Sequence, residues 1–530
     1  MALLAPLAAV LALGAGSASL WLDEITYFRL QSDLPLRAAE IGRAGSALAP
    51  YFSNFFYCDL QRFFQALLGA AGLAMAIEWR VRALSLLAYA ATIGLIAVRA
   101  DRQDRPWRGV ASALVFAAAP VFLYYAFEAR VYALTAFFVV LLLERIENAA
   151  SGDGRAPLIV LGALGVLVAW LHLWTLCLFA SLFVLAAVEV VRRRRLSRLA
   201  AVLFASSIPA LAMIVLEFGY MKVTQPPEPL FALFARQPFG GTLVQTGISI
   251  FEGPLQVQVA FQQPLARFFV AACLVLLSLL VFGALREIEP DGAFGARSAA
   301  AVSLGALAIS VALAVGFGYF VHGRYQVPLY AGLVWAVARG ASSRRSQLLV
   351  LLLVACEVVL LPSSAAAIRA KSNDAEIAAT ILKDSARAGT AVIVQHGVVS
   401  GYPAPHHSIG LDFYLNDVHP SAVRIPIFEL PDLKPTLGDH GTYRYFNGGK
   451  PLLSRVLAIR REAYRSWAAR SGRRDVWVIQ PLWDVAPSRN QIATLLGVLV
   501  GEGWYAVEGR FVAPGYPRAV VIHLRQRQPS

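Results

Sequence analysis

Two neighbouring acids, Asp23 and Glu24, stand where a carboxylate could act as a general base. They follow directly on the first apolar run of the chain, and the aromatic residues Trp21 and Tyr27 flank them. A carboxylate beside lipid is poorly hydrated, which makes it a better proton acceptor. Adjacent acids also cap helix N-termini, and on spacing alone a cap is the more frequent explanation. The pair is a candidate catalytic base with that alternative open.

A second acid stands beside a base in a very short turn between two apolar runs. Glu128 and Arg130 belong to the segment Tyr124–Leu134, in which Tyr132 follows closely. The turn is so tight that both charges must lie within the membrane boundary, where ionisable groups are costly and usually either paired or functional. A structural ion pair and a substrate-binding acid explain this turn equally well.

Four more side chains border or interrupt apolar runs. Arg324 offers the planar fork of donors that suits a phosphate, and Tyr325 follows it. Interfacial snorkelling, with Tyr325 in an aromatic belt, would give the same pattern. Lys222 could also hold an anion, although nothing distinguishes it from a surface lysine. His172 divides a long apolar stretch and can equally be a polar turn residue.

Signatures of other chemistries are weak or absent. The four cysteines are scattered, without the spacing of a disulfide framework or a zinc site. A group of histidines and acids lies in a stretch rich in Pro and Gly without regular ligand spacing, which favours exposed loop residues over a metal site. Its members are His406, His407, Asp412, Asp417 and His419. The sequence has no P-loop, no GxGxxG after a strand and no nucleophile elbow, so nucleotide-driven chemistry is disfavoured.

Composition indicates what must position these residues. Of 530 residues, 58% are apolar and only 15% are charged, against about 25% charged in a typical soluble domain. The mean hydropathy is +0.60. Much of the net charge of +14 is arginine in short clusters between apolar runs, a pattern typical of membrane topology signals rather than of nucleic-acid binding. We therefore expect a polytopic membrane protein with no nucleic-acid partner.

Eleven apolar runs approach the roughly 20 residues that a membrane helix needs. They are Ala2–Leu20, Arg82–Val98, Gly109–Phe127, Val131–Leu143, Ala156–Leu171, Trp174–Val191, Leu199–Phe218, Phe268–Leu285, Ala299–Phe320, Val327–Ala338 and Leu348–Pro362. The first run could instead be a cleaved signal peptide, although it lacks a basic N-terminal region. We expect about 11 transmembrane helices.

Arginines gather at alternate junctions between these runs, for example over Arg99–Arg108 and Arg192–Arg198. By the positive-inside rule these junctions are cytoplasmic. The opposite junctions and the tail after Pro362 are then extracytoplasmic. That face receives the candidate residues Asp23, Glu24, Glu128, Arg130, His172, Lys222, Arg324 and Tyr325.

The tail shifts to a mixed polar composition. The span 375–388 is periodic like an amphipathic helix, and Thr390–Gln395, Asp475–Gln480 and Ala519–Leu524 have the pattern of buried strands. The stretch Gly397–Lys450 is rich in turn residues. We predict two domains: residues 1–365 form a transmembrane domain, and residues 366–530 form a soluble extracytoplasmic α/β domain.

The ordered set of motifs resembles the GT-C superfamily of membrane glycosyltransferases, in the family 39 branch with the protein mannosyltransferases and the aminoarabinose lipid A transferases. The matching pieces are Asp23-Glu24, Glu78–Ser85, Glu128–Leu134, His172 and Gly323-Arg324-Tyr325. Their order and predicted membrane side agree with the family. One departure is Tyr51–Asp59, which stands where many relatives carry a His-Pro-Pro-like stretch.

The resemblance implies an inverting transfer of sugar from a polyprenyl-phosphate donor to an acceptor hydroxyl at the outer membrane face. Asp23 would be the general base and Glu24 would assist it. Arg130, Arg324 and Lys222 would neutralise the leaving phosphate, while Tyr132, His172 and Tyr325 would contact sugar or phosphate. Glu128 would orient the acceptor, pair with Arg130 or hold a divalent cation, for which Asp23 is the other candidate ligand.

The resemblance leaves the acceptor open, and two other functions remain as alternatives. Lipid A, another envelope glycolipid, a polysaccharide or a protein could be the acceptor. The high content of Ala, Arg and Leu favours a bacterial inner membrane, with the C-terminal domain in the periplasm.

A transporter or flippase of lipid-linked sugars is the main alternative function. Transporters usually carry midplane charges and inverted repeats, whereas this sequence shows charges at one edge and no repeat. A membrane-anchored binding protein is a second alternative.

Overall fold

The computed structural model describes most of the chain in two compact units. The described residues are 4–13, 24–25, 52–73, 75–100, 106–152, 157–224, 264–290, 292–317, 323–341, 343–369, 372–394, 397–399, 402–404, 410–429, 450–482, 494–513 and 518–527. One unit comprises Met1–Gly16 and Tyr27–Ile368, and the other comprises Ser17–Thr26 and Arg369–Ser530. Each unit is described by itself below.

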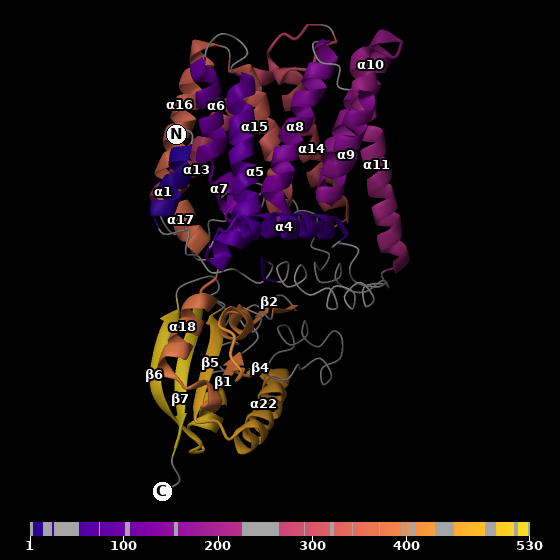
Figure 1. The fold of residues 1–530 in the computed structure, drawn as a ribbon. Helices are drawn as coiled ribbons and strands as arrows, with labels where there is room; N and C mark the ends of the chain where they lie inside the picture. The colour runs from indigo at the N-terminus through magenta and orange to yellow at the C-terminus, as the bar shows by residue number, and fades with distance from the viewer. Residues whose placement is uncertain are drawn as a thin grey trace. The chain divides into compact units, whose positions relative to one another are not determined.

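The first unit is a helical bundle (Figure 1). Its helices are α1 (Ala5–Ala12), α4 (Phe52–Ala70), α5 (Ile77–Ala100), α6 (Pro106–Ala118), α7 (Pro120–Ala126), α8 (Val131–Ser151), α9 (Leu158–Leu171), α10 (Leu176–Arg193), α11 (Arg198–Thr224), α13 (Pro264–Leu285), α14 (Ala296–Phe317), α15 (Val327–Gly340), α16 (Arg344–Val359) and α17 (Leu361–Arg369). Most of them run roughly side by side, whereas α4 crosses their direction (Figure 1).

Several of these helices could cross a membrane, as expected of a multi-pass membrane protein. Within the described part of the chain, five are long and apolar enough, or up to seven if each of two bent pairs counts as one span. The five are Ile77–Arg99, Leu173–Arg193, Arg198–Leu216, Phe268–Leu285 and Ala296–Leu313. The predicted spans at Ala2–Leu20, Val131–Leu143, Ala156–Leu171 and Val327–Ala338 are not among them, so the count of eleven stays a prediction.

Backbone chemistry explains the sharper of the two bends and one close helix contact. Gly109–Ala118 and Pro120–Ala126 meet at 66°, because the proline ring at the start of α7 removes a helical hydrogen-bond donor. Elsewhere α9 packs closely on α11, since a Cβ atom at Gly165 would collide with the carbonyl oxygen of Ser206.

One end of the bundle, which we call the arginine-rich end, is held by ion pairs. Glu144, which is nearly fully buried, lies 2.8 Å from Arg99 Nε and 3.3 Å from Arg145 Nε. Glu147 of α8 pairs with Arg339 of α15, and Arg339 Nη1 also donates to the carbonyl oxygen of Arg99 at 3.2 Å. The last turns of α5, α8 and α15 are thereby tied together.

The second unit contains a five-stranded sheet in the order β4-β1-β5-β7-β6 (Figure 1). Its strands are β1 (Thr390–Val394), β4 (Ile427–Glu429), β5 (Asp475–Leu482), β6 (Tyr505–Ala513) and β7 (Arg518–Gln526), and a hairpin of β2 (Gly397–Val399) and β3 (Tyr402–Ala404) is separate. β4, β1 and β5 are parallel, while β7 and β6 are antiparallel to their neighbours. Parallel pairing requires crossovers, and α22 (Lys450–Ser471) lies in the connection between β4 and β5.

A hydrophobic core forms on one face of this sheet. Val476, Val478 and Ile522 of the strands pack with Tyr464 of α22 and Leu495. The helix predicted over residues 375–388 is α18 (Asp374–Asp384), and β1, β5 and β7 coincide with the three predicted strands. β6, β4 and α22 were not predicted.

Candidate functional site

The site begins with the tight turn between α7 and α8. α7 ends at Ala126, and the amide of Arg130 then donates to the carbonyl oxygen of Glu128 at 2.8 Å before α8 starts at Val131. Because so few residues join the two helices, both charged side chains lie against the bundle. Glu128 is only 2% exposed, and its Oε1 atom lies 3.6 Å from Arg130 Nη1. The ion pair, which was one of the two alternatives for this turn, is therefore present.

A chain of aromatic rings leads away from this ion pair. The Arg130 guanidinium lies over the Tyr132 ring, 5.1 Å from its centre. Tyr132 contacts the ring of Tyr125 at 4.9 Å between centroids and the ring of His172 at 5.4 Å. His172 in turn lies 5.8 Å from Tyr325. An acid, a cation and a set of polar-edged rings thus form one continuous cluster.

These residues come from three turns that are far apart in the sequence. α9 ends at Leu171, and the amide of His172, which caps the helix, donates to the carbonyl oxygen of Val168 at 3.3 Å. Tyr325 belongs to η6 (Gly323–Gln326), the 3₁₀ turn that leads into α15. The turn at 127–130, the turn at His172 and η6 all lie at the end of the bundle opposite the arginine-rich end, because α8 and α15 each run from one end to the other. We call this end the site end.

Two buried serines connect the turns to neighbouring helices. Ser85 Oγ of α5 donates to the carbonyl oxygen of Arg130 at 3.3 Å. Ser310 Oγ of α14 accepts hydrogen bonds from Trp174 Nε1 at 2.9 Å and from Gln326 Nε2 at 3.1 Å. The second serine joins η4 (Leu173–Thr175) to η6, which helps to fix His172 relative to Tyr325.

The structure brings together Glu128, Arg130, Tyr132, His172 and Tyr325, but it does not describe every predicted site residue. Asp23 lies outside the described residues, whereas Glu24 is described and fully buried. Lys222 is part of α11 and Arg324 is part of η6, with side chains outside the described set.

Four residues of the cluster were missed by sequence reasoning: Tyr125, Trp174, Ser310 and Gln326. Gln326 directly follows Tyr325, and Trp174 and Tyr125 lie two and three residues from His172 and Glu128, so proximity in the sequence was the available signal for these three. Ser310 has no predicted site residue near it in the sequence, and it is fully buried in α14. A single polar residue in an apolar run carries no sign of the partner it will meet.

A divalent cation finds no ready set of ligands in the part of the chain that the structure describes. No group of three or more His, Cys, Asp or Glu residues there is placed to hold one, and Glu128 pairs with the Arg130 guanidinium. In the second unit Arg424 Nη2 lies 3.2 Å from Asp412 and 3.6 Å from Asp417, so these acids face a cation of the protein itself. His406 and His407 lie outside the described residues, and the carbonyl oxygen of His419 accepts from Arg387 at 2.7 Å.

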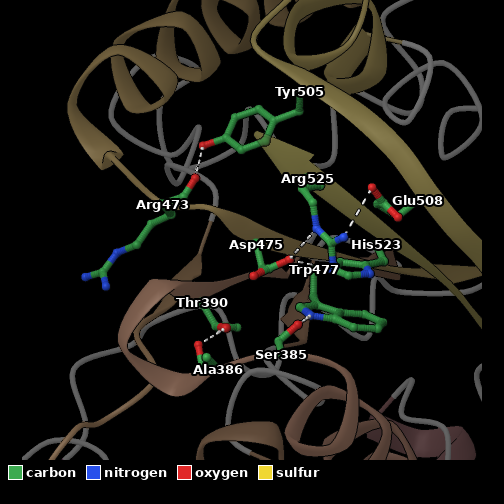
Figure 2. Close-up of polar contacts among 10 residues, drawn as sticks. All are labelled: Ser385, Ala386, Thr390, Arg473, Asp475, Trp477, Tyr505, Glu508, His523 and Arg525. Atoms are coloured by element: carbon green, nitrogen blue, oxygen red, sulfur yellow. Dashed lines mark hydrogen bonds and ion pairs between the residues drawn. The ribbon is translucent and has the colours of Figure 1, made fainter. Parts of the chain in front are cut away.

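The second unit also contains a polar network on one face of its sheet (Figure 2). Asp475 Oδ1 is 2.9 Å from His523 Nε2 and 3.4 Å from Arg525 Nε. The Trp477 ring stacks on His523 at 4.2 Å with the planes within 5°, and Trp477 Nε1 donates to Ser385 Oγ at 2.8 Å. Because its members bond to one another and are paired across β5 and β7, we interpret this network as a structural support.

Comparisons with known proteins give limited information. No family model matches the sequence, and no curated protein matches it significantly. Among solved structures, the chain is similar to ArnT from Cupriavidus metallidurans in the apo state, with 12% identity, a TM-score of 0.30 and coverage of 89% of this chain and 92% of that one. It is also similar to the same protein bound to undecaprenyl phosphate, with 13% identity, a TM-score of 0.34 and coverage of 98% and 97%. Scores at this level do not establish a shared fold or activity.

Proposed function

We propose that this chain is an inverting glycosyltransferase that moves a sugar from a polyprenyl-phosphate donor to an acceptor hydroxyl at the outer face of a bacterial inner membrane. The observation that carries the proposal is the meeting of three turns, at Glu128–Arg130, at His172 and at Tyr325. These turns are the ones whose order in the sequence resembles the GT-C superfamily. A pair that served only to mark a helix turn would not require His172 and Tyr325 beside it.

The proposed reaction is a direct displacement at the anomeric carbon. The acceptor oxygen forms a bond to that carbon, while the bond from the carbon to the phosphate oxygen breaks and its electron pair leaves with the lipid phosphate. The acceptor proton passes to the Asp23 carboxylate, with Glu24 assisting. A phosphate is a good leaving group, so one base is sufficient and a strong general acid is not required.

The described cluster supplies two things that this reaction needs. Negative charge develops on the departing phosphate, and a fixed guanidinium in a water-poor site stabilises such charge much more than it would in water. Arg130, held over Tyr132 and beside Glu128, is suited to this role. Arg324 and Lys222 are further candidates for the phosphate. The rings of Tyr132, His172 and Tyr325 offer apolar faces with polar edges, as small-molecule sites commonly do.

The remaining assignments complete the proposal. Residues 1–365 form the transmembrane catalytic domain, and residues 366–530 form a periplasmic domain that covers or binds the acceptor. The stretch Gly397–Lys450 is its proposed contact surface. Lipid A, another envelope glycan and protein hydroxyls are the acceptor classes to compare.

The test is the release of free polyprenyl phosphate by the purified full-length protein. A panel of polyprenyl-phosphate sugars is supplied with crude envelope acceptors, and wild type is compared with Asp23→Asn. Asp33→Asn is the matched control, because it makes the same chemical change in the same segment. We expect wild type and Asp33→Asn to turn over one donor, and Asp23→Asn to bind that donor without turnover.

Two outcomes would contradict this expectation. Turnover by Asp23→Asn at the wild-type rate would remove Asp23 as the base. If no donor is consumed under any condition, the flippase alternative gains, and movement of the same lipids across vesicle membranes becomes the decisive measurement.

A further inference from the structure

The two bent helix pairs of the bundle pack against each other near a buried acid that the proposed reaction does not use. Helix α6 of the first pair contacts α16 of the second (Figure 1). The second pair, Arg344–Val359 and Leu361–Arg369, meets at 43°. Glu357 lies on α16 just before this bend and is only 5% exposed. It also falls inside the predicted span Leu348–Pro362.

A proline interrupts the backbone hydrogen bonds at each bend. Pro120 is the first residue of α7 and Pro362 is the second residue of α17. A proline has no amide hydrogen to donate to the preceding turn. At the first bend the Tyr89 hydroxyl of α5 donates to the carbonyl oxygen of Ala117 at 2.5 Å. A carbonyl group beside the break thus takes a side chain as its partner, as interrupted helices within a membrane require.

Glu357 lies near the middle of the bundle along the helix axes. α15 ends at Gly340 at the arginine-rich end, and α16 starts at Arg344 after a short turn, so α16 begins at the same end. Glu357 is 13 residues further along, which is about 20 Å from that end. Because the hydrocarbon core of a bilayer is about 30 Å thick, this depth is well inside it.

In the part of the chain that the structure describes, Glu357 has no cationic partner. Its Oε2 atom has no hydrogen-bond partner there, and no arginine or lysine forms an ion pair with it. The titratable groups of neighbouring helices that interact with Glu357 are Tyr89 of α5 and Cys273 of α13, and neither is a base. Glu144, by contrast, is similarly buried but faces two arginines. A carboxylate without water or a cation is far more costly to bury than the neutral acid.

We propose that the two packed bends form a proton-binding site in the interior of the bundle, with Glu357 as the group that holds the proton at neutral pH. Interrupted helices that meet at mid-depth around an ionisable side chain are a common arrangement for binding coupling ions in membrane proteins. A proton fits this site better than a metal ion, because no group of three or more His, Cys, Asp or Glu residues in the described ranges is placed to hold a metal. The inference rests on the spanning character of the two bent pairs and not on the chemistry of sugar transfer.

Labelling with the hydrophobic reagent dicyclohexylcarbodiimide tests the site. The acid proton moves to a nitrogen of the reagent while the carboxylate oxygen bonds to its central carbon, so a protonated carboxyl group reacts and an ionised one does not. The full-length protein in liposomes is treated at about pH 7, where a glutamate in water is ionised, and its peptides are analysed by mass spectrometry. Glu144 is the internal control, because it is paired with Arg99 and Arg145. We expect at least about tenfold more label on Glu357 than on Glu144.

Infrared spectroscopy detects the proton without requiring the reagent to reach the acid. Wild type at about pH 7 should show the carbonyl stretch of a protonated carboxylic acid, and Glu357→Gln should lack that band. The glutamine side chain has nearly the same shape and is neutral, so this variant should fold. Glu289→Gln is the matched control and should retain the band, because Glu289 is partly exposed and accepts hydrogen bonds from Ser298.

Three outcomes would overturn the proposal. The first is equal labelling of Glu357 and Glu144, and the second is an infrared band that Glu357→Gln leaves unchanged. The third is protection of Glu357 from the reagent by sodium chloride but not by choline chloride, which would assign the site to a metal cation instead. If the reagent labels neither acid, the infrared comparison decides. Neither measurement needs turnover, so a failure here is distinguishable from a failure of the proposed reaction.

Discussion

The two ends of the helical bundle use the same kinds of charged residue in different ways. At the arginine-rich end Glu144 has Arg99 at 2.8 Å, Arg145 at 3.3 Å and the amide of Asn148 at 2.5 Å. At the site end Glu128 pairs with Arg130 at 3.6 Å, and the Arg130 guanidinium lies over the Tyr132 ring.

The two ends differ in which elements supply their charges. At the arginine-rich end short ion pairs connect the last turns of three different helices, so each charge contributes to packing. At the site end Glu128 and Arg130 come from a single turn, between α7 and α8. Ionisable groups inside a membrane boundary are costly. Substrate binding is the role that we propose for the pair at the site end.

Replacing one arginine at each end tests whether the two ends differ in role, and we expect the change at the site end to affect the reaction rate most. We expect Arg130→Met to reduce the rate of polyprenyl-phosphate release by a factor of about 10²–10³. The variant lacks the fixed positive charge that stabilises the negative charge developing on the leaving phosphate. Arg339→Met is the matched control at the arginine-rich end, where it breaks the pair with Glu147. Its rate per folded molecule should stay within about threefold of wild type. Equal losses in both variants would mean that the two ends do not differ in role.

The reverse comparison concerns stability. Glu144→Gln removes a nearly fully buried carboxylate from two arginines, and breaking such a pair costs about 3–5 kcal/mol when both partners are buried. Arg99 is 26% exposed and Arg145 is 45% exposed, so water compensates part of the loss and we expect about 2–3 kcal/mol. Thermal unfolding of the detergent-solubilised protein measures the change. Glu128→Gln should shift the midpoint less, and a larger shift for it would contradict the assignment.

Changing an aromatic ring of the cluster at the site end should affect activity less than changing Arg130. Tyr325→Leu removes the ring that contacts His172 at 5.8 Å and Trp174 at 6.2 Å, and we expect kcat/KM to fall about tenfold. Tyr325→Phe keeps the ring, so it should retain most of the activity if stacking is what the position supplies. A loss in Tyr325→Phe as large as in Tyr325→Leu would assign the effect to the hydroxyl group instead.

Local constraint made part of this geometry predictable from the sequence. A turn as short as Glu128–Arg130 between two apolar helices leaves few arrangements, and an ion pair was one of the two alternatives expected for it. Ser310 was not predictable, because its role depends on Trp174 and Gln326 arriving from two other segments. Such hydrogen-bond partners are set by tertiary packing, which cannot be inferred from helix propensity or from the periodicity of apolar residues.

Two missed elements show the same limit in the fold. α4 lies in a segment that was predicted as a long extracytoplasmic connection, because the segment is too polar for a membrane span. That this segment forms a helix packed on α5 is shown only by the structure. β6 was missed because the register shift between Val507 and Gly509 interrupts the alternation of inward and outward side chains. Both elements are defined by what they pack against.

An ion pair exposed to water should contribute less to the free energy of unfolding than the buried pairs of the helical bundle. Arg465 of α22 contacts Glu502 at 2.7 and 2.9 Å, and both side chains are substantially exposed. Hydrogen bonding from Arg465 holds the pKa of Glu502 below its ordinary value. A carboxylate with a lowered pKa contributes stability above its unfolded pKa and loses that contribution as pH falls through the folded value.

We therefore expect Arg465→Gln to lower the unfolding midpoint of the C-terminal unit by no more than about 1–2 °C at pH 7. The difference from wild type should disappear below about pH 4, where carboxylates become protonated, and it should shrink in high salt. Tryptophan fluorescence of the full-length protein during heating provides the measurement. Arg470→Gln is the control, since the Arg470 side chain donates to the carbonyl oxygen of Ser466. A destabilisation by Arg465→Gln as large as that of Glu144→Gln would show that exposure to water does not separate these pairs.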